Sequence, residues 1–353
     1  MAKILMKGNE AIGAAAIKAG CKYFFGYPIT PQNEIPEYMS REMPKVGGVF
    51  LQAESEVAAI NMVYGAAGAG GRVMTSSSSP GIALKQEGIT YIAGAELPCV
   101  IVNIVRGGPG LGGIQPAQSD YNQATRGGGN GDYKLLVYAP ANLQEMVDLV
   151  QEAFDAADFY RNPVMVMADG MIGQMMEPIE FRDVPKRELP LKDWATTGTG
   201  GKRKPNIINS LALDPYELED HNTKLQAKYA LIKEKETRYE MHNIENAEIV
   251  LVAYGTTSRI AKNAIEILGE EGIKVGLIRP ITVWPFPDKA FDEIPADCKG
   301  VMSVEMSCGQ MIDDCKIAVN GRFPVGFFGR SGGVIPTPEG IVNAVKEMIG
   351  GTK

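Results

Sequence analysis

Three polar side chains in the first third of the sequence have the types and surroundings that chemistry requires: Thr30, Glu56 and Arg106. Thr30 belongs to the run Tyr27–Pro31, in which two prolines restrict the backbone on both sides of it. Its hydroxyl is therefore expected at a fixed position on a loop at a strand end. The same hydroxyl could instead cap the helix that the following residues predict.

Glu56 opens a stretch, residues 57–70, that is rich in alanine and glycine. Glu54 and Glu56 are two positions apart and should point to different sides of a helix. A carboxylate at the start of such a closely packing helix is partly desolvated, which favours its neutral form and lets it share a proton with a ring nitrogen. The simpler alternative is that both carboxylates only stabilise the amino-terminal end of the helix.

Arg106 follows the apolar run Leu97–Val105 and precedes the glycine-rich residues 107–113. An arginine at a strand end beside flexible backbone suits two-point capture of a carboxylate or phosphate. A surface arginine at the start of a loop would give the same pattern. The hydroxyl-rich turn Thr75–Gly81 is compatible both with ligand binding and with helix capping.

Nucleotide and histidine-based sites find little support in the sequence. The glycine cluster at 65–71 follows a predicted helix rather than a strand, and no GxxxxGK[ST] run occurs. The two histidines, His221 and His242, lie in or beside a charged segment, so we expect both to be solvated. A metal site or a catalytic triad built on histidine would lack members, and we predict no metal bound by this chain.

The five cysteines show no CxxC spacing, which argues against a disulfide framework. Cys21 and Cys99 lie in apolar runs and should be buried. Cys308 and Cys315 could be redox-active or act as ligands, but neither has the close sequence partner that such roles need.

The bulk composition points to a protein of the cytoplasm. The chain has 353 residues, enough for two domains, and a net charge of −7, which argues against a nucleic-acid surface. No apolar stretch approaches the roughly 20 residues of a membrane span. The opening residues carry too short an apolar patch for a signal peptide. We therefore expect no membrane or nucleic-acid partner.

Alternating patterns predict the elements that must position these residues. Helical spacing recurs at residues 8–19, 54–69, 82–93 and 143–158. Strand-like runs lie between these helices, at residues 21–27, 73–76, 97–105, 135–138 and 164–168. This alternation predicts an α/β fold with a doubly wound parallel sheet and with ligand groups at the strand ends.

The alternation of predicted helices and strands is interrupted in the middle of the chain. After an irregular segment, residues 216–241 read as a charged helix, and strands and helices resume from 247. We expect a first domain at 1–180, a linker with a charged helix at 181–244, and a second, smaller α/β domain at 245–353.

The motifs together resemble those of the 2-oxoacid:ferredoxin oxidoreductases. In the first domain the matching runs include GNEAIGAAAIKAGCKYFFGYPITP, QAESEVAAINMVYGAAGAG and VMTSSSSPGIALKQEGITYIAGAELPCVIVNIVRGGPG. The resemblance implies a pyrimidine-binding domain for thiamine diphosphate there. VAYGTTSRIAKNAI, VGLIRPITVWPFP and VEMSCGQM imply a transketolase C-terminal-like domain II after it. YPITPQNEIPEY and TSSSSPG are most similar to the 2-oxoisovalerate (branched-chain) subunits, with the 2-oxoglutarate and pyruvate types as close alternatives.

The resemblance also implies a role for each candidate residue. Glu56 is expected to hydrogen-bond N1′ of the aminopyrimidine, so that the 4′-amino group can remove the thiazolium C2 proton. Arg106 is expected to pair with the substrate carboxylate, and Thr30 to lie beside its oxo group. The remaining cofactor contacts are expected from Tyr27, Pro28, Ile29, Ser79 and Pro80.

The family's diphosphate–magnesium motif, GDG, and the cysteine spacing of an iron–sulfur cluster do not occur in the chain. The resemblance therefore implies that thiamine diphosphate is shared with a diphosphate-binding β-type subunit. Mg²⁺ and 4Fe–4S clusters are expected only on partners, which include γ-type and ferredoxin-like subunits. Ferredoxin would accept the electrons, and coenzyme A (CoA) would accept the acyl group of the 2-oxoacid.

Two other functions stay open. One is a non-oxidative transketolase or decarboxylase component, which needs no ferredoxin. The other is a non-catalytic assembly subunit, in which Thr30, Glu56 and Arg106 would not face a common cavity. The small-residue helix at 57–70 would also suit a homodimer of the chain alone.

Overall fold

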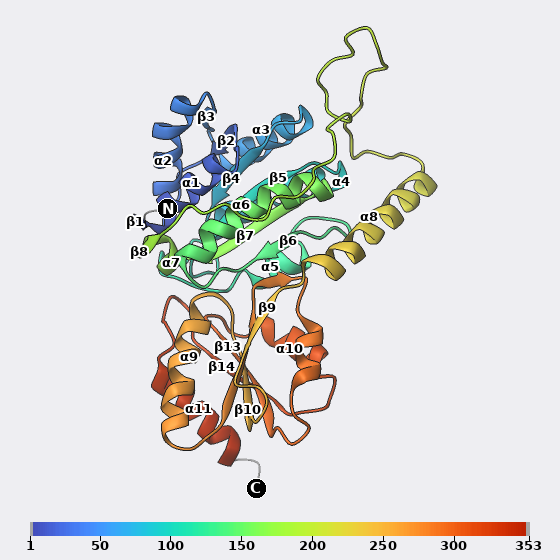
Figure 1. The fold of residues 1–353 in the computed structure, drawn as a ribbon. Coiled ribbons are helices and arrows are strands. Elements are labelled where there is room, and N and C mark those ends of the chain that lie inside the picture. Colours follow the sequence, from blue (N-terminus) through green and yellow to red (C-terminus); the bar gives the residue numbers. More distant parts are fainter. Residues whose placement is uncertain (1–2, 351–353) are drawn as a thin grey trace.

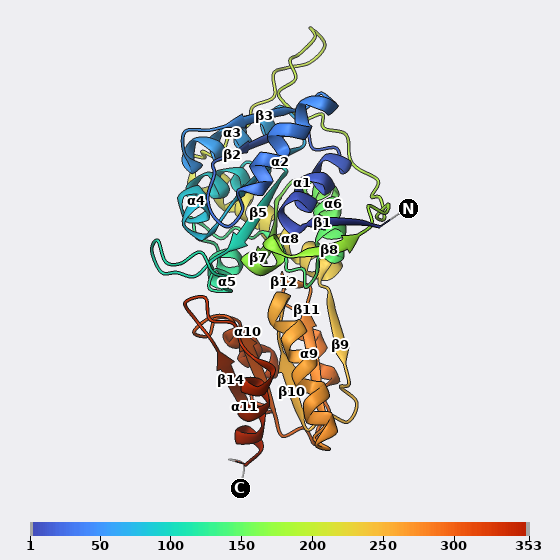
Figure 2. The same ribbon diagram turned by 90° about the vertical axis from the view of Figure 1, so that its left-hand side faces the viewer.

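The computed structural model describes residues 3–350, which form two α/β parts that lie end to end in both views of the ribbon (Figures 1 and 2). The first part is built on a seven-stranded sheet in the order β12 (Thr282–Trp284), β6 (Leu136–Tyr138), β7 (Pro163–Asp169), β5 (Cys99–Val105), β4 (Val73–Ser77), β2 (Tyr23–Gly26) and β3 (Val49–Gln52). All neighbours in this sheet are parallel except β12 and β6. The α/β class predicted from the sequence is confirmed.

The second part contains a five-stranded sheet in the order β14 (Val325–Gly329), β13 (Gly300–Glu305), β10 (Ile249–Val252), β11 (Val275–Pro280) and β9 (Tyr239–His242). Only β9 is antiparallel to its neighbour. A separate ribbon joins β1 (Ile4–Lys7) to β8 (Met176–Ile179).

Helices cover these sheets. In the first part they are α1 (Gly8–Lys18), α2 (Glu34–Glu42), α3 (Glu56–Gly68), α4 (Ser79–Gly94), α5 (Tyr121–Arg126), α6 (Leu143–Tyr160) and α7 (Gly170–Gln174), with a 3₁₀ turn at Met43–Val46. The connector carries α8 (Pro215–Glu236). The second part has α9 (Gly255–Glu270), α10 (Met311–Val319) and α11 (Pro338–Gly350), with a 3₁₀ turn at Asp288–Glu293.

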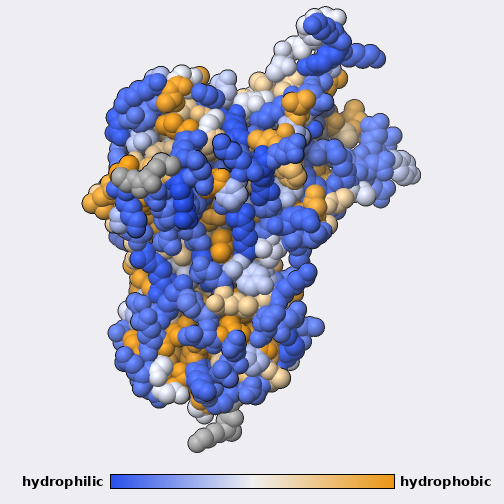
Figure 3. Space-filling view, in the orientation of Figure 1, coloured by the Kyte–Doolittle hydropathy of each residue, from blue (hydrophilic) through white to orange (hydrophobic). Residues whose placement is uncertain are grey.

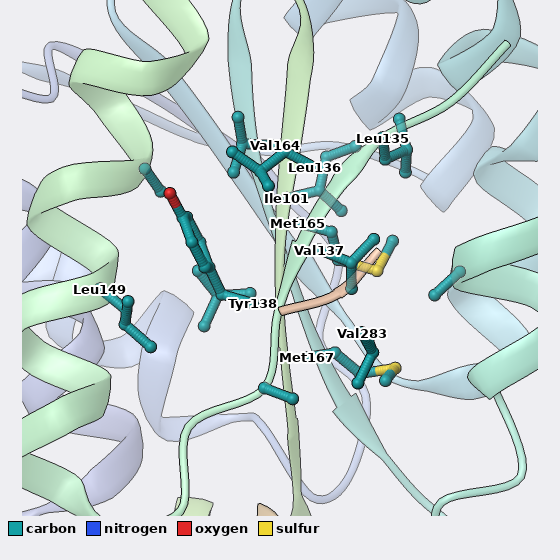
Figure 4. Close-up of a cluster of buried hydrophobic side chains, with 14 of the residues drawn as sticks. Ile101, Leu135, Leu136, Val137, Tyr138, Leu149, Val164, Met165, Met167 and Val283 are labelled. Atoms are coloured by element: carbon teal, nitrogen blue, oxygen red, sulfur yellow. The ribbon is translucent and has the colours of Figure 1, made fainter. Parts of the chain in front are cut away.

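The core of the first part lies on the central strands. β5 and β7 are buried at every position, as expected of parallel strands covered by helices on both faces. Figure 4 shows how Ile101 of β5, Tyr138 of β6 and Leu149 of α6 contribute to one cluster. This packing fixes the strand ends from which the candidate site residues project.

The connector differs from the sequence prediction at its end. The charged helix stops at Glu236, because Thr237 turns extended and the next residues pair with Pro280–Leu277 as β9. Residues 180–214 are irregular, and part of this arm projects above the first sheet in Figure 1. Figure 3 shows mostly hydrophilic residues over the tip of this arm and over α8.

The two parts share strands across the predicted domain boundary. β12, from within residues 245–353, lies antiparallel to β6 and covers that edge of the first sheet. β9, from within residues 181–244, belongs to the second sheet. No helix within residues 3–350 is long and apolar enough to cross a membrane.

The predictions for four single residues can be compared with the structure. Cys21 and Cys99 are buried, as predicted. His242 is exposed, but the prediction of a solvated His221 is wrong, because that ring is partly buried with its Nε2 2.7 Å from the carbonyl oxygen of Gly94.

Candidate active site

The candidate residues stand at one edge of the first sheet. The parallel strands β2, β3, β4 and β5 end there together, so the residues that follow them meet. The loop at Tyr27–Pro31 follows β2, Glu56 begins α3 after β3, α4 follows β4, and Arg106 follows β5 directly.

Glu56 is the first residue of α3 and is only 7% exposed. Ser55 caps this helix, accepting a hydrogen bond from the backbone N–H of Ala58 (3.1 Å). Glu54 is exposed and lies before the helix, so the prediction that both carboxylates belong to one helix is wrong. One carboxylate oxygen of Glu56 lies against Gly81 of α4, and no side chain within residues 3–350 hydrogen-bonds it. The carboxylate is thus buried with its acceptor capacity unused.

Arg106 is a buried side chain, and the interpretation as a surface arginine is wrong. Its Nη1 donates to the backbone carbonyl of Thr30 (2.8 Å) and its Nη2 to that of Leu111 (3.0 Å). Ser79 on the first turn of α4 holds its backbone, since the Ser79 hydroxyl accepts from the Arg106 N–H (3.1 Å). The Nε atom is buried without a partner. An anionic group could satisfy this donor.

Thr30 lies on a tightly held loop, as the two prolines predicted. Pro31 accepts hydrogen bonds through its carbonyl from Asn9 (2.7 Å) and Gln174 (3.0 Å), and the buried Gln32 donates to the carbonyl of Tyr27 (3.3 Å). The Thr30 side chain is exposed, and its hydroxyl lies 3.5 Å from the Asn33 amide. The alternative that Thr30 caps α2 is wrong, because Asn33 occupies that position.

The structure brings these residues together around the first turn of α4. Arg106 contacts Thr30 directly, and Ser79 and Gly81 of the same turn adjoin Arg106 and Glu56. Ser77, at the end of β4, has a fully buried hydroxyl without a hydrogen-bond partner. The hydroxyl-rich turn does not cap α4 through a side chain, since Ser78 donates instead to the carbonyl of Ile104.

A cavity of about 780 Å³ opens beside this turn, between the two parts. Ser79 and Pro80 line it, whereas Thr30, Glu56 and Arg106 do not, which is what the alternative of an assembly subunit predicted. The rest of its wall consists of Ala83, Leu84, Gly108, Pro109, Gly110, Leu111, Ala117, Ser119, Asp120, Gln123, Met306, Ser307, Cys308, Gln310, Ser331 and Gly332. The wall contains no lysine, arginine or histidine, so it offers no positive charge to an anionic group inside the cavity.

Asp120 is the one carboxylate of the wall, and sequence reasoning missed it. Burial raises the pKa of Asp120, although the amide of Asn103 donates a hydrogen bond to it (2.9 Å) and opposes this effect. Its position in SDYNQA carries no spacing signal. The alignment of Asp120 with Asn103 depends on the fold alone.

Residues of the second part complete the wall, and their roles were also missed. Glu305 is fully buried and accepts hydrogen bonds from the Ser303 and Ser307 hydroxyls and from the N–H groups of Gln310, Met311 and Ile312. Gln118 links the parts, donating to the carbonyl of Tyr254 (2.8 Å) and accepting from the N–H of Met306 (2.9 Å). In the sequence, the only indication of this role is the position of Glu305 among small and polar residues in the run VEMSCGQM.

Thiol and metal chemistry have little basis in the arrangement. Cys308 is exposed on the cavity wall and Cys315 is buried, and neither forms a disulfide. No group of three potential metal-ligating side chains occurs in the described part of the chain. The site does offer the carboxylate of Glu56 as an acceptor, together with the unpaired hydroxyl of Ser77 and the unpaired Nε of Arg106. These groups fit a polar heterocycle and an anionic substrate.

Comparison with known proteins gives the family. The profile of "Pyruvate flavodoxin/ferredoxin oxidoreductase, thiamine diP-bdg" matches residues 14–246, and that of "Pyruvate:ferredoxin oxidoreductase core domain II" matches 247–341. Ketoisovalerate oxidoreductase subunit VorB of Methanothermobacter marburgensis is 51% identical, with 99% of each chain covered. The 2-oxoglutarate synthase subunit KorA of Methanocaldococcus jannaschii is 37% identical, with 96% of this chain and 98% of KorA covered.

Solved structures agree with these relatives. The 2-oxoglutarate:ferredoxin oxidoreductase from Magnetococcus marinus, with 2-oxoglutarate, coenzyme A and succinyl-CoA bound, matches with a TM-score of 0.85 at 29% identity, over 98% of this chain and 65% of that one. A split-gene transketolase (TM-score 0.61, 15% identity, 98% of both chains) shares the fold. The chain is therefore a member of the 2-oxoacid:ferredoxin oxidoreductase family, an oxidoreductase subunit with its thiamine diphosphate-binding domain and core domain II.

Proposed function

We propose that this chain is the α-type subunit of an enzyme that oxidatively decarboxylates a branched-chain 2-oxoacid, 2-oxoisovalerate above all. With CoA as acyl acceptor the products are the acyl-CoA, CO₂ and reduced ferredoxin. The observation that carries the proposal is the meeting of Glu56, Arg106 and Thr30 around one helix turn at the strand ends. The VorB relative, named for ketoisovalerate, supports the same substrate.

Each residue has a role that its contacts support. Thiamine diphosphate, when bound, supplies the electron sink for decarboxylation. Glu56 accepts the hydrogen bond of the aminopyrimidine N1′ with a carboxylate that nothing else in residues 3–350 occupies. The unpaired Nε of Arg106 is the donor that remains for the substrate carboxylate. Thr30 offers its exposed hydroxyl to the oxo group, and the strand-end loops with Tyr27, Pro28, Ile29, Ser79 and Pro80 hold the pyrimidine.

The cavity wall favours an apolar substrate side chain. Leu84, Leu111 and Met306 face the space, and no cation lines it. A 2-oxoglutarate molecule would bring its distal carboxylate to a wall whose single charged group is Asp120, at a desolvation cost of several kcal/mol. Pyruvate would leave much of the apolar wall without contact. The side chain of a branched-chain 2-oxoacid carries no charge and is large enough to contact the apolar wall.

The proposal includes partner subunits. Relatives of nearly the same length are named as subunits, VorB and KorA. A β-type partner holds the diphosphate with Mg²⁺, and γ-type and ferredoxin-like partners carry the 4Fe–4S clusters, with the complex in the cytoplasm. In this chain, residues 1–180 form the pyrimidine-binding domain, 181–244 the linker and 245–353 domain II.

The test is CoA-dependent viologen reduction by the complex reassembled with its co-purified partners. Glu56→Gln should lower turnover by at least about 100-fold, because an amide replaces the carboxylate that shares the ring proton. Glu54→Gln is the matched control, since Glu54 is exposed two residues before the first residue of α3 and should leave turnover unchanged. Normal turnover by the Glu56 variant would refute the assignment.

The substrate is tested on the same complex with a panel of 2-oxoacids. We expect kcat/KM for 2-oxoisovalerate to exceed that for 2-oxoglutarate by at least about 100-fold. Burying the distal carboxylate of 2-oxoglutarate without a counter-charge costs roughly 3 kcal/mol, which corresponds to this ratio. Arg106→Lys should raise the KM for every 2-oxoacid about tenfold, because a lysine has no Nε–H donor to offer while its head group bonds the carbonyls of Thr30 and Leu111. Equal use of 2-oxoglutarate would contradict the branched-chain part and leave the reaction class intact.

A further inference from the structure

The arm between β8 and α8 carries a loop of defined shape, residues 193–206, which projects away from the second part in both ribbon views (Figures 1 and 2). The side-chain amide of Asn206 closes this loop by donating to the carbonyl oxygens of Asp193 (2.5 Å) and Ala195 (3.0 Å). The turn at its tip contains Gly201 at a φ of 70°, which glycine adopts without strain. Contacts within the loop therefore determine its shape.

The tip of the loop is strongly basic. Lys202, Arg203 and Lys204 are exposed and form no ion pair within residues 3–350. Arg203 donates only to carbonyl oxygens and to one hydroxyl of the loop itself. Cations nearer the base of the arm are paired inside the chain: Arg182 with Asp148, Arg187 with Glu236 and Lys192 with Asp158. The charge of residues 202–204, which we call the basic loop, is therefore available to a partner.

The start of α8 has the opposite character. Glu217, Glu219 and Asp220 are exposed and form no ion pair in the part of the chain that the structure describes. Lysines further along the helix do pair: Lys224 and Lys228 with Glu96, and Lys233 with Asp288. Large apolar side chains beside these acids are 68–88% exposed: Leu211, Leu213 and Tyr216. Residues 211–220, which we call the acidic segment, thus combine unpaired negative charge with uncovered apolar surface.

The basic loop and the acidic segment complement each other but do not meet in one copy of the chain. No ion pair joins them within residues 3–350, and Figure 1 shows the tip of the arm standing clear of the start of α8. A second copy offers each surface the charge that it lacks. In a pair with two-fold symmetry every contact occurs twice, so one approach neutralises both loops and both segments. An unrelated partner would need both charge patterns at matching positions.

We propose that two copies of this chain exchange arms, with the basic loop of each copy lying on the acidic segment of the other. The inference does not depend on the function proposed above. The apolar side chains of the acidic segment are then buried beside the ion pairs. Their burial supplies affinity, and the opposite charges fix the register of the two copies. The small-residue helix at 57–70 has no part in this contact.

The first test is sedimentation equilibrium of the full chain, which gives the dissociation constant of the pair. The loop variant carries three charge reversals: Lys202→Glu, Arg203→Glu and Lys204→Glu. Like charges then oppose each other at both contacts, so the constant should rise at least about 100-fold. Raising the salt concentration from about 0.1 to about 1 M should also weaken the unmodified pair, because the Debye length falls from about 10 to about 3 Å.

The matched control changes the net charge equally at exposed positions away from the arm: Lys235→Glu, Lys274→Glu and Lys289→Glu. Its dissociation constant should stay within about threefold of the unmodified value, because these charges face no second copy in the proposed pair.

A charge swap tests whether the basic loop and the acidic segment contact each other. The segment variant carries Glu217→Lys, Glu219→Lys and Asp220→Lys, and alone it should pair as poorly as the loop variant. In an equimolar mixture of the two variants, each loop again faces a segment of opposite charge. The mixed pair should therefore form within about tenfold of the unmodified affinity. Recovery on mixing also shows that both variants are folded.

A zero-length carbodiimide cross-link identifies the contact directly, because it joins a lysine amine to a carboxylate that touches it. The sample is a mixture of unlabelled and nitrogen-15-labelled chains. We expect mass spectrometry to find peptides that join Lys202 or Lys204 to residues 217–220, with one light and one heavy partner. The same cross-links should appear in the complex reassembled with its co-purified partners.

Several results would overturn the inference. One is a chain that stays monomeric at low salt, and another is a pair that survives reversal of the basic loop, as a contact through residues 57–70 would. A mixture of the two variants that does not pair, although the loop variant alone remains folded by circular dichroism, has the same meaning. So do cross-links that join the basic loop only to its own chain or only to a different subunit of the complex.

Discussion

Replacing Gly81 with alanine tests how closely the Glu56 carboxylate is positioned. The added β-carbon would stand 2.6 Å from Oε1 of Glu56 and closer still to the Ser77 hydroxyl. Ordinary contact begins near 3.4 Å, so the carboxylate must move by roughly 0.8 Å. Misplacing a reacting group by about 1 Å costs on the order of 100-fold in rate. We therefore expect turnover in the assembled complex to fall 10- to 100-fold.

The assay is viologen reduction, with complex assembly and far-ultraviolet circular dichroism measured on the same preparation. Gly269→Ala is the control, because it makes the same change in an exposed turn of α9 with nothing within 4 Å. It should keep turnover and stabilise the fold by about 0.5–1 kcal/mol. Combining Ser77→Ala with Gly81→Ala should restore little activity, since the contact with Glu56 persists. Full activity of Gly81→Ala would show that the carboxylate needs no fixed position and would refute this reasoning.

Three further predictions concern the two parts and the buried groups. Arg279→Met should destabilise the chain by about 3–5 kcal/mol in urea unfolding, because this buried guanidinium of the second part pairs with Glu145 of the first at 2.7 Å; an unchanged midpoint would contradict it. Burial lowers the pKa of Lys85 from 10.5 to about 7, so between these values the unfolded chain holds more protons and stability should rise with pH, by up to about 5 kcal/mol. Lys85→Met should flatten that rise in urea midpoints measured across this window. Alkylation of the native chain with iodoacetamide should modify the exposed Cys308 first, since burial raises the pKa of Cys21 and Cys99 to about 12; mass spectrometry showing equal labelling would be inconsistent with their burial.

The sequence predicts those features that depend on runs of one residue type. Apolar runs such as Leu97–Val105 are long enough to identify buried parallel strands, and β5 is buried throughout. A close contact of α3 is present, but the residues that allow it are Gly81 and Gly88 of α4, which face Glu56 and Ile60, and not the small residues of α3 itself. The backbone at Thr30 is fixed in position, as predicted from the prolines on both sides of it.

Features that depend on contacts between distant segments could not be predicted. Lys85 in IALKQEG resembles an exposed helical lysine, and only the polar residues Thr75 and Ser76 of β4 make its burial possible. Its spacing from Gly81 and Gly88 is the signal that could have located it on the packed face. β12 is too short to assign from its pattern, and its pairing with β6 depends on the docking of the second part.

The two parts contribute differently to the proposed chemistry. The groups proposed to meet the cofactor, Glu56 and its neighbours on α4, all belong to the first part. The cavity proposed for the substrate side chain takes part of its wall from Met306–Cys308 and Gln310, which Glu305 and Gln118 fix from either side. Substitutions in this second wall can change its size and polarity without moving Glu56 or Arg106. Substrate choice within the family can therefore vary through core domain II while the cofactor contacts stay the same.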